Sequence, residues 1–291
     1  MQQVNSMHDL TTTIQSAHRP HHVERMLRAL EPRVPIWYVP FAEVKDYEAA
    51  GAVAAGVEGQ LPMKPKQLNE ALEQGFAKTY GTPSKLVVTM DDDFVKMRKL
   101  VVKENGKPGA EAISLNDAID LLAADLMERD YYLAGIAGST NPFFAKNGNS
   151  YHGMITGQLL VHKENPLGLR FDENLKMLED LDFILQHHTA YGGLVKNRSL
   201  LPEFHIFGRS ARTDKKYEGG YKPYRTEEVQ QATLDYLASK FPDPEIVFYN
   251  QGLGKSVQDK IRFKAYIEKR RHAYGMAGQP ASQEDGGGQN G

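Results

Sequence analysis

Residues 86–94 of the chain read LVVTMDDDF, and the predicted fold is built outward from this stretch. The apolar, partly β-branched first half is typical of a buried strand, which ends abruptly at three consecutive carboxylates. Alternate side chains of a strand share a face, so Asp91 and Asp93 are expected to point at one target and Asp92 away from it. A divalent cation between Asp91 and Asp93 would offset their mutual repulsion. The simpler interpretation is an acidic turn after a strand.

The chain before residue 86 has the composition of alternating strands and helices. The periodicity of its apolar residues predicts strands at 11–15 and 34–40, and helices at 21–30, 43–55 and 66–80. This alternation predicts a parallel sheet covered by helices, with ligands bound at the carboxyl ends of the strands. Two polar segments follow such ends, at Ser16 to Pro20 and at Asp91 to Asp93. Their common position favours a shared site.

A second acidic motif lies at residues 178–185, which read LEDLDFIL. We expect it to begin a helix that runs to Tyr191 and stops at the two glycines that follow. Carboxylates in a first turn are stabilised by the helix dipole, which leaves a purely structural interpretation open. The three carboxylates Glu179, Asp180 and Asp182 nevertheless exceed what capping needs, and this favours a functional role.

The remaining segments complete an α/β pattern. They comprise a basic, turn-rich segment at 97–109, a helix at 114–128 capped by Ser114, strands at 131–137 and 154–161 around a polar loop at 138–151, an edge strand or connection at 194–201, a strand at 202–207 carrying His205, a helix at 226–240 capped by Thr226, a short strand at 246–248 and a basic helix at 255–272.

The composition bounds the class of protein. The 291 residues are 41% hydrophobic and 25% charged, as in ordinary soluble globular proteins. The absence of cysteine excludes disulfides, cysteine-ligated zinc and iron–sulfur clusters. No apolar run approaches a membrane span and the N-terminus lacks a signal-peptide pattern, so we expect a cytoplasmic protein with no membrane partner. The net charge of -2 argues against non-specific coating of nucleic acid, although residues 255–271 are locally basic.

Several chemistries match the acidic strand end poorly. An EF-hand loop needs spaced oxygen ligands and a central glycine, which residues 91–94 lack. The chain has no Walker A loop and no GxGxxG fingerprint, which disfavours ATP-driven and nicotinamide chemistry. A haloacid-dehalogenase-type phosphatase also uses an Asp-x-Asp strand end, usually near the chain start and followed by a lysine and a distal acidic pair, and it stays a less favoured alternative.

Four motifs give the chain a recognisable pattern: Ser16-x-x-Arg19-Pro20, Met90-Asp91-Asp92-Asp93-Phe94, Glu179-Asp180-x-Asp182-Phe183 and His205. Because these motifs occur in this order at strand ends and at a helix start, the chain resembles the GT-A class of glycosyltransferases over most of residues 11–210. Within that class it is most similar to the TET/JBP-associated glycosyltransferases of phages. These relatives of the base J glucosyltransferase are thought to glycosylate hydroxymethylated pyrimidines in DNA.

The resemblance implies an α/β fold with a GT-A, Rossmann-like mixed sheet, helices on both faces and a C-terminal helical extension. Residues 1–10 would be a flexible terminus, 11–210 the catalytic domain, 211–274 a basic lid loop with C-terminal helices packed on that domain, and 275–291 a disordered tail. The implied activity is metal-dependent transfer of a sugar from a nucleotide-sugar, such as UDP-glucose, to a 5-hydroxymethylpyrimidine such as hydroxymethylcytosine in DNA. The protein would then work in the host cytoplasm if it is phage-encoded.

The reaction suggests roles for the acidic residues. A Mn²⁺ or Mg²⁺ ion would offset the charge of the diphosphate leaving group, with Asp91 and Asp93 as carboxylate ligands and His205 completing the shell. Asp180 is the expected general base for the acceptor hydroxyl, supported by Glu179 and Asp182. If the enzyme retains the anomeric configuration, Asp180 would only orient the acceptor.

Other residues are expected to bind the nucleotide-sugar. The base would stack near Tyr38 or lie by the turn at Ser16 to Arg19, where Arg19 can reach phosphate or base. Asp91 and Asp92 would lie beside the diphosphate. A mobile basic loop would close over it, through Arg209, Arg212, Lys215, Lys216 and Tyr221.

Alternatives remain open for the substrate and for catalysis itself. The acceptor can instead be a polysaccharide or a protein, and a third hypothesis is a non-catalytic nucleotide-sugar-binding module.

Overall fold

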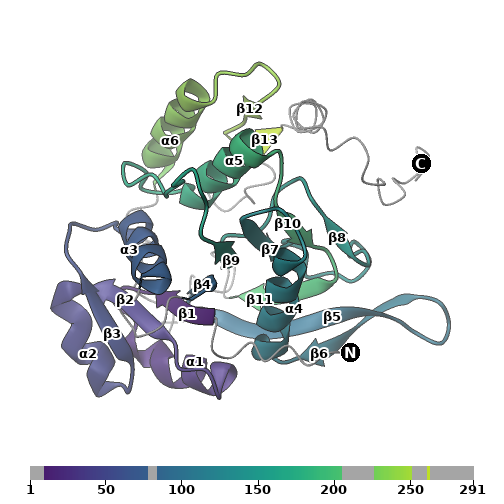
Figure 1. The fold of residues 1–291 in the computed structure, drawn as a ribbon, viewed down its shortest axis with the longest axis horizontal. Helices are drawn as coiled ribbons and strands as arrows, with labels where there is room; N and C mark the ends of the chain where they lie inside the picture. The colour runs from purple at the N-terminus through teal and green to yellow at the C-terminus, as the bar shows by residue number, and fades with distance from the viewer. Residues whose placement is uncertain (1–9, 78–83, 205–225, 251–260, 263–291) are drawn as a thin grey trace.

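Figure 1 shows the computed structural model, which describes residues 10–77, 84–204, 226–250 and 261–262. An eight-stranded sheet runs through it in the order β3-β2-β1-β4-β9-β7-β10-β8. Parallel and antiparallel neighbours both occur, so the predicted α/β class with a mixed sheet is confirmed. None of the described helices is long and apolar enough to cross a membrane.

The first half of the sheet is parallel. Its elements are β1 (Leu10–Gln15), the short η1 (Pro20–His22), α1 (Val23–Leu30), β2 (Ile36–Pro40), η2 (Phe41–Glu43), α2 (Val44–Ala49), β3 (Val53–Val57), α3 (Lys64–Phe76) and β4 (Leu86–Asp91). Strand β1 pairs in parallel with both β2 and β4, and β2 with β3. The strands predicted at 11–15, at 34–40 and from Leu86 are therefore confirmed.

The helix predicted at 43–55 is wrong in its second half. Helix α2 ends at Ala49, Gly51 has a φ of 95°, and the chain continues as the edge strand β3. Alanine favours a helix in isolation, but the backbone of β3 completes the hydrogen bonds of β2, and that pairing outweighs local propensity.

The second half of the sheet is mixed. Its elements are α4 (Leu115–Met127), β7 (Leu133–Ile136), β8 (Asn149–Ser150), β9 (Leu159–Lys163), α5 (Glu179–Tyr191) and β10 (Val195–Asn197). Strand β9 lies antiparallel between β4 and β7, and β10 is parallel to β7. Because β4 and β7 therefore run in the same direction, the carboxyl ends of β1, β2, β4, β7 and β10 share one edge of the sheet.

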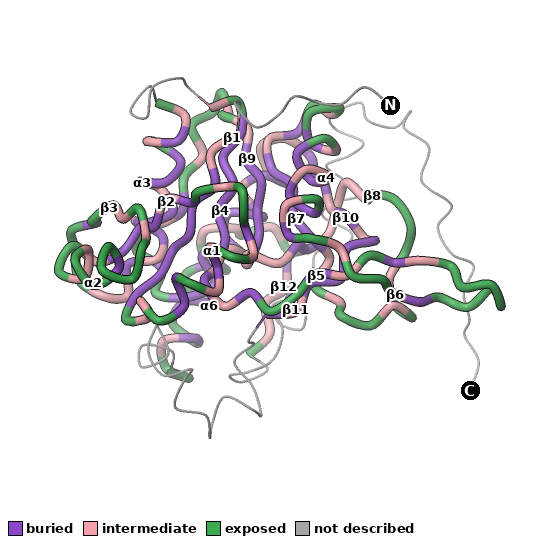
Figure 2. The backbone as a smooth tube through the Cα atoms, turned by 90° about the horizontal axis from the view of Figure 1, so that it is seen from below, coloured by how far each residue is buried: buried purple, intermediate pink, exposed green. Residues whose placement is uncertain are grey.

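A long hairpin begins directly after the acidic strand end. Strand β5 (Phe94–Val102) pairs with β6 (Pro108–Ile113) and with β11 (Leu200–Phe204) in a separate antiparallel sheet. Figures 1 and 2 show the hairpin extending away from the body of the protein. The turn-rich segment predicted at 97–109 is confirmed only at 103–107, the turn of the hairpin, and is wrong on either side of it, because the exposed cations of β5 obscure the pattern of its buried Met97 and Leu100. Strand β11 covers the first part of the strand predicted at 202–207.

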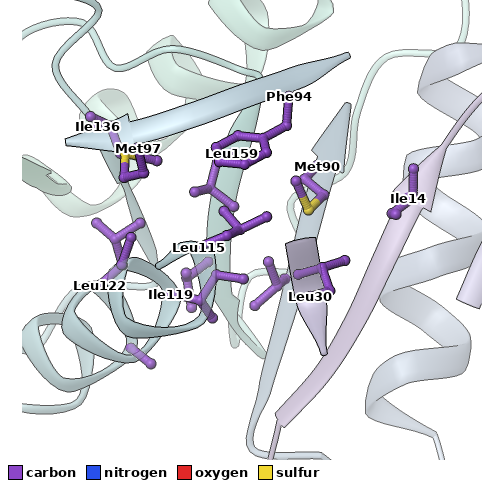
Figure 3. Close-up of a cluster of buried hydrophobic side chains, with 14 of the residues drawn as sticks. Ile14, Leu30, Met90, Phe94, Met97, Leu115, Ile119, Leu122, Ile136 and Leu159 are labelled. Atoms are coloured by element: carbon purple, nitrogen blue, oxygen red, sulfur yellow. The ribbon is translucent and has the colours of Figure 1, made fainter. Parts of the chain in front are cut away.

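Helices cover both faces of the large sheet, as predicted. On one face, α1 and α4 pack against Ile14, Val88 and Met90, a cluster that Figure 3 shows in part. On the other face, α3 and α5 pack against Val87 and Leu160, together with α6 (Glu227–Lys240). The neighbours Val87 and Val88 of β4 thus enter opposite cores, and burying each contributes on the order of 2 kcal/mol.

Three predicted helix ends are confirmed. The Ser114 side chain accepts a hydrogen bond from Asp117 N at 3.0 Å, and Thr226 caps α6 in the same way. Gly192 ends α5 in the left-handed region, with a φ of 71°. The basic helix predicted at 255–272 is wrong at residues 261–262, which form β13 and pair with β12 (Val247–Phe248). There the side chain of Ile261 is buried in the core beside α5 and α6.

Candidate functional site

The two acidic motifs meet at one lysine. Strands β1 and β4 are paired so that Gln15 lies opposite Asp91, which brings the turn after β1 beside the acidic strand end. The ammonium of Lys64, the first residue of α3, lies 2.8 Å from Asp91 Oδ1 and 3.2 Å from Glu179 Oε1. The first turn of α5 therefore approaches the carboxyl end of β4 at this edge of the sheet. Asp91 and Glu179, one from each acidic motif, thus share one cation.

Asp92 anchors the turn after β1. Its buried carboxylate accepts a hydrogen bond from Ser16 Oγ, and Arg19 Nη1 donates to Oδ1 at 2.9 Å. Its backbone carbonyl accepts hydrogen bonds from His22 Nδ1 at 3.0 Å and from Arg25 Nη2 at 2.8 Å. Burial alone would raise the pKa of Asp92, but the hydrogen bond from His22 and the charge of Arg19 hold it below the ordinary value. Asp92 thus faces the turn, while Asp91 faces Lys64.

Tyr47 and Glu43 hold the same turn from its other side. The Tyr47 hydroxyl lies 2.5 Å from Ser16 Oγ and accepts a hydrogen bond from Arg19 N at 3.0 Å. Burial raises the pKa of Tyr47, so its hydroxyl keeps its proton. His18 has a φ of 60°, and its backbone N donates to Glu43 Oε2 at 2.6 Å. A side chain at positive φ is a strained conformation that the surrounding contacts must compensate.

Asp93 has an unsatisfied carboxylate. Its Oδ1 is buried and accepts no hydrogen bond from the residues that the structure describes. Burial raises the pKa of Asp93 well above its usual range, and the charges of Asp91 and Asp92 raise it further. These observations indicate a local shortage of positive charge. A hard divalent cation, which prefers carboxylate oxygens, fits this shortage.

Two residues that the sequence did not single out hold α3 against the site. Gln67 is fully buried, and its Nε2 donates to Ser16 O at 2.9 Å and to Tyr38 O at 2.8 Å. Lys64 stands at a helix N-terminus, where the helix dipole disfavours a cation, and Asp91 and Glu179 compensate. The signal for this helix start was Pro65 in its first turn, which the prediction of a helix from residue 66 missed.

The second acidic motif begins with a strained residue. Leu178 has a φ of 60° and a ψ of 26°, the left-handed region that a leucine rarely adopts. Glu179 follows, buried beside Lys64, and Asp180 packs against Gly157 so closely that a methyl group at Gly157 would clash with it. The neighbouring Gln158 carbonyl accepts the hydrogen bond of Asp91 N at 3.0 Å. The segment at Gly157 and Gln158 therefore connects Asp180 to Asp91.

Asp182 lies on another face of α5. Its Oδ1 is 2.7 Å from Lys240 Nζ, and the same ammonium is 2.7 Å from Asp172 Oδ2. Two residues along an α-helix rotate a side chain by roughly 200°, so Asp182 points toward α6 and away from Asp180. Burial raises the pKa of Asp182, although Lys240 opposes that rise. The structure brings Glu179 and Asp180 to the site and places Asp182 in a link between helices.

Tyr38 is not an open stacking surface for a base. Its side chain is fully buried beneath α3, and its hydroxyl donates to Gln74 Oε1 at 3.1 Å. The turn at Ser16 to Arg19 is the remaining predicted position for the base. The expected metal ligand His205 and the expected lid residues Arg209, Arg212, Lys215, Lys216 and Tyr221 lie outside the described residues.

The described residues include two candidate ligands for a cation. Within residues 10–77, 84–204, 226–250 and 261–262, no cluster of three or more histidine, aspartate or glutamate side chains is arranged to hold a metal ion. Asp91 and Asp93 could nevertheless supply two carboxylate ligands to a divalent cation, because the buried Asp93 Oδ1 accepts no hydrogen bond from the described residues. Comparison of the chain with models of protein families and with curated proteins gives no match.

Proposed function

We propose that the chain is a metal-dependent glycosyltransferase of the GT-A type, which moves a sugar from a nucleotide-sugar such as UDP-glucose to a hydroxyl acceptor. The observation that carries the proposal is the position of Lys64, 2.8 Å from Asp91 and 3.2 Å from Glu179. It joins the acidic end of a central parallel strand to a second acidic motif. Ligands of open α/β sheets bind at this edge.

The donor half of the site would be built on β4. Asp91 and Asp93 would hold a Mn²⁺ or Mg²⁺ ion, with His205 as a further ligand. That ion supplies positive charge against the diphosphate as the glycosidic bond breaks. Arg19 is held in place by Asp92, at the turn proposed for the nucleotide. Lys64 would exchange its contact with Asp91 for a contact with the diphosphate.

The acceptor half would be built on the first turn of α5. Asp180 would accept the proton of the acceptor hydroxyl, or orient that hydroxyl if the configuration is retained. Leu178 and Gly157 fix the position of Asp180 from both sides, which suits a group that must stay within hydrogen-bond reach of a substrate. Glu179 would support it by holding Lys64.

For the acceptor, we propose a 5-hydroxymethylpyrimidine in DNA. The support is chemical: a hydroxymethyl group offers the nucleophile, and the basic residues of 209–225 and 255–271 offer charge to a phosphate backbone. A polysaccharide or a protein is the alternative acceptor.

The test begins with the donor alone. The full chain is incubated with Mn²⁺ and a panel of UDP-sugars, and release of UDP is measured with and without EDTA. We expect hydrolysis that EDTA abolishes and that Asp93→Ala removes. Unchanged turnover in Asp93→Ala would contradict the metal assignment. Mass spectrometry of hydroxymethylcytosine- and hydroxymethyluracil-containing DNA, incubated with the same mixture, then tests the acceptor: no gain in mass with any sugar would exclude DNA and leave the donor reaction standing.

A further inference from the structure

The loop between β7 and β8 carries two exposed phenylalanines next to each other. The side chains of Phe143 and Phe144 are 73% and 69% exposed, and their rings form a perpendicular pair with centroids 5.4 Å apart. Neither ring belongs to a core cluster. Contiguous exposed apolar groups, unlike apolar residues scattered singly over a surface, are a feature of interaction sites.

Hydrogen bonds fix the conformation of the loop that carries these two rings. Asn141 forms the turn that carries them, since its Oδ1 accepts from Phe143 N at 3.0 Å and its carbonyl from Phe144 N at 3.1 Å. Arg98 of β5 donates to Thr140 O at 2.9 Å on one side of the turn. On the other side, Arg198 donates to Asn147 O at 3.1 Å. One arginine side chain therefore holds each end of the loop.

The loop itself, and the strands β7 and β9 on either side of it, carry charge of one sign. Residues 131–163 contain no aspartate or glutamate, although the chain has 37 acidic residues in all. Lys146 lies in the loop and is exposed, and its backbone N donates to Arg198 O at 3.2 Å. On the adjoining β11, Glu203 is already paired with Lys96 at 3.1 Å. The surface complements an anionic partner.

The loop lies on the same edge of the sheet as the acidic site. It follows the carboxyl end of β7, which runs in the same direction as β4. Thr156 N donates to Ile136 O at 2.9 Å at the base of the loop, and the next residue, Gly157, contacts Asp180. A continuous path of the chain thus leads from the loop to the proposed acceptor position.

We infer that this surface, formed by Phe143, Phe144, Arg98, Lys146 and Arg198, binds the acceptor as a single DNA strand with unstacked bases. Aromatic faces stack bases of any sequence, and flanking cations contact the phosphates. The inference rests on the proposed function for the choice of DNA, and it assigns the strand a position that leads to Asp180. Unstacked bases suit this site, because a base that is out of its stack can enter a protein site and bring its hydroxymethyl group to a catalytic carboxylate.

The test measures binding by fluorescence anisotropy, with the full chain and a labelled single-stranded oligonucleotide containing 5-hydroxymethyluracil. We expect the double variant Phe143→Ala/Phe144→Ala to weaken binding at least about tenfold, the order of effect that lost base stacking produces. Lys146→Gln should lower the slope of log affinity against log salt by about 0.7. The matched controls are Phe41→Ala and Lys45→Gln, both exposed beside β2 and β3 at the other end of the sheet. They should change neither quantity.

Three results would overturn the inference. The first is no binding of the oligonucleotide by the wild-type chain at low salt. The second is a wild-type chain that binds a DNA duplex more tightly than the single strand, with an affinity for the duplex that the double phenylalanine variant does not change. The third is a double variant that loses self-association in sedimentation but keeps full affinity for DNA, which would make the rings a contact between copies of the chain.

Hydrolysis of UDP-sugar without acceptor separates this inference from the proposed function. The double phenylalanine variant should hydrolyse donor at the wild-type rate, because its rings do not belong to the donor half of the site. A wild-type chain that hydrolyses donor but binds no strand contradicts the surface alone. A wild-type chain that binds the strand through the two rings but hydrolyses no donor contradicts the glycosyltransferase and supports the surface.

Discussion

The Lys64 ammonium lies 2.8 Å from Asp91 Oδ1, at the point where a central strand ends and a helix begins. The same ammonium reaches Glu179 at 3.2 Å, so a single cation balances two carboxylates from distant parts of the chain. The proposed metal ion would bind at the same carboxylate, Asp91. Lysine and metal therefore compete for one negative charge.

The first prediction follows from this competition. In EDTA, Lys64→Met should lower the free energy of unfolding by about 1 to 3 kcal/mol, because two partly buried carboxylates lose their partner. Mn²⁺ should then raise the melting temperature of the variant more than that of the wild type. Melting curves with and without Mn²⁺ measure both effects. Lys66→Met is the matched control, since Lys66 is near in sequence and donates to Glu58 O instead. An equal response to Mn²⁺ in wild type and Lys64→Met would refute the competition.

The second prediction concerns Asp93. Asp93→Asn removes a buried carboxyl group whose pKa burial raises to about 8 and whose Oδ1 accepts no hydrogen bond from the described residues, so the protein in EDTA should gain about 1 kcal/mol of stability. Donor hydrolysis should nevertheless fall at least about a hundredfold, because the proposed cation loses a ligand. Urea unfolding and UDP release measure the two quantities. A variant that is less stable and fully active would contradict both halves of the prediction.

How far the sequence predicted this site depends on what each residue signals locally. The strands β1, β2 and β4 are visible because buried β-branched runs end at Pro or at polar clusters, and α4 and α6 are visible because Ser114 and Thr226 cap them. Lys64 carried no such signal. A single lysine between Met63 and Pro65 has no periodicity, and its role exists only when α3 is packed across β1 and β4.

Other parts could not be predicted because long-range pairing decides them. The alanines of β3 favour a helix until β2 offers a partner. Strand β5 alternates poorly at its start because a bulge in its pairing with β11, beside Phe204, changes which residues face inward, and its cations suggest a loop. Asp182 matched the acidic motif by spacing, yet the rotation of α5 directs it to Lys240.

The third prediction tests the role of Asp182. Lys240→Met should destabilise the protein by about 3 kcal/mol, because it leaves the fully buried Asp182 carboxylate without its cation. Adding Asp182→Asn should recover much of that loss. Transfer per folded molecule should stay close to wild type in the double variant, since both groups lie between α5 and α6. If transfer is lost while folding is intact, Asp182 takes part in the reaction.

The fourth prediction uses the contact between Gly157 and Asp180. A methyl group at Gly157 would clash with the Asp180 side chain, so Gly157→Ala should displace that carboxylate. A displacement on the order of 1 Å can lower a rate about a hundredfold. Sugar transfer should therefore fall in Gly157→Ala, and in Asp180→Asn, while both variants keep hydrolysis of the donor. If Gly157→Ala loses donor hydrolysis and Asp180→Asn keeps it, the substitution has instead displaced Asp91, whose backbone N donates a hydrogen bond to the carbonyl of Gln158, the residue after Gly157.

The fifth prediction concerns the pH dependence of stability. Burial lowers the pKa of His162 to about 3, of His187 to about 4 and of His188 to about 3, from an ordinary value of 6.5. Between these pKa values and 6.5, the unfolded chain binds protons that the folded chain does not. The free energy of unfolding is therefore highest above pH 6.5 and decreases as the pH falls below that value. Protonation of the three residues in the unfolded chain should lower the free energy of unfolding by about 4 kcal/mol from about pH 7 to about pH 5.5. Urea unfolding at the two pH values measures the loss.

His188→Gln should remove about 1 kcal/mol of that loss, because glutamine can still donate to the Gly153 carbonyl but does not titrate. The exposed His21→Gln serves as the control and should leave the loss unchanged. Stability that is equal at the two pH values would mean that these imidazoles are protonated within the fold. The burial of His162 argues against that outcome. Among the described residues its ring contacts Phe171 and Phe183 and has the Thr89 hydroxyl as its polar partner, so a charged imidazole there would lose its hydration.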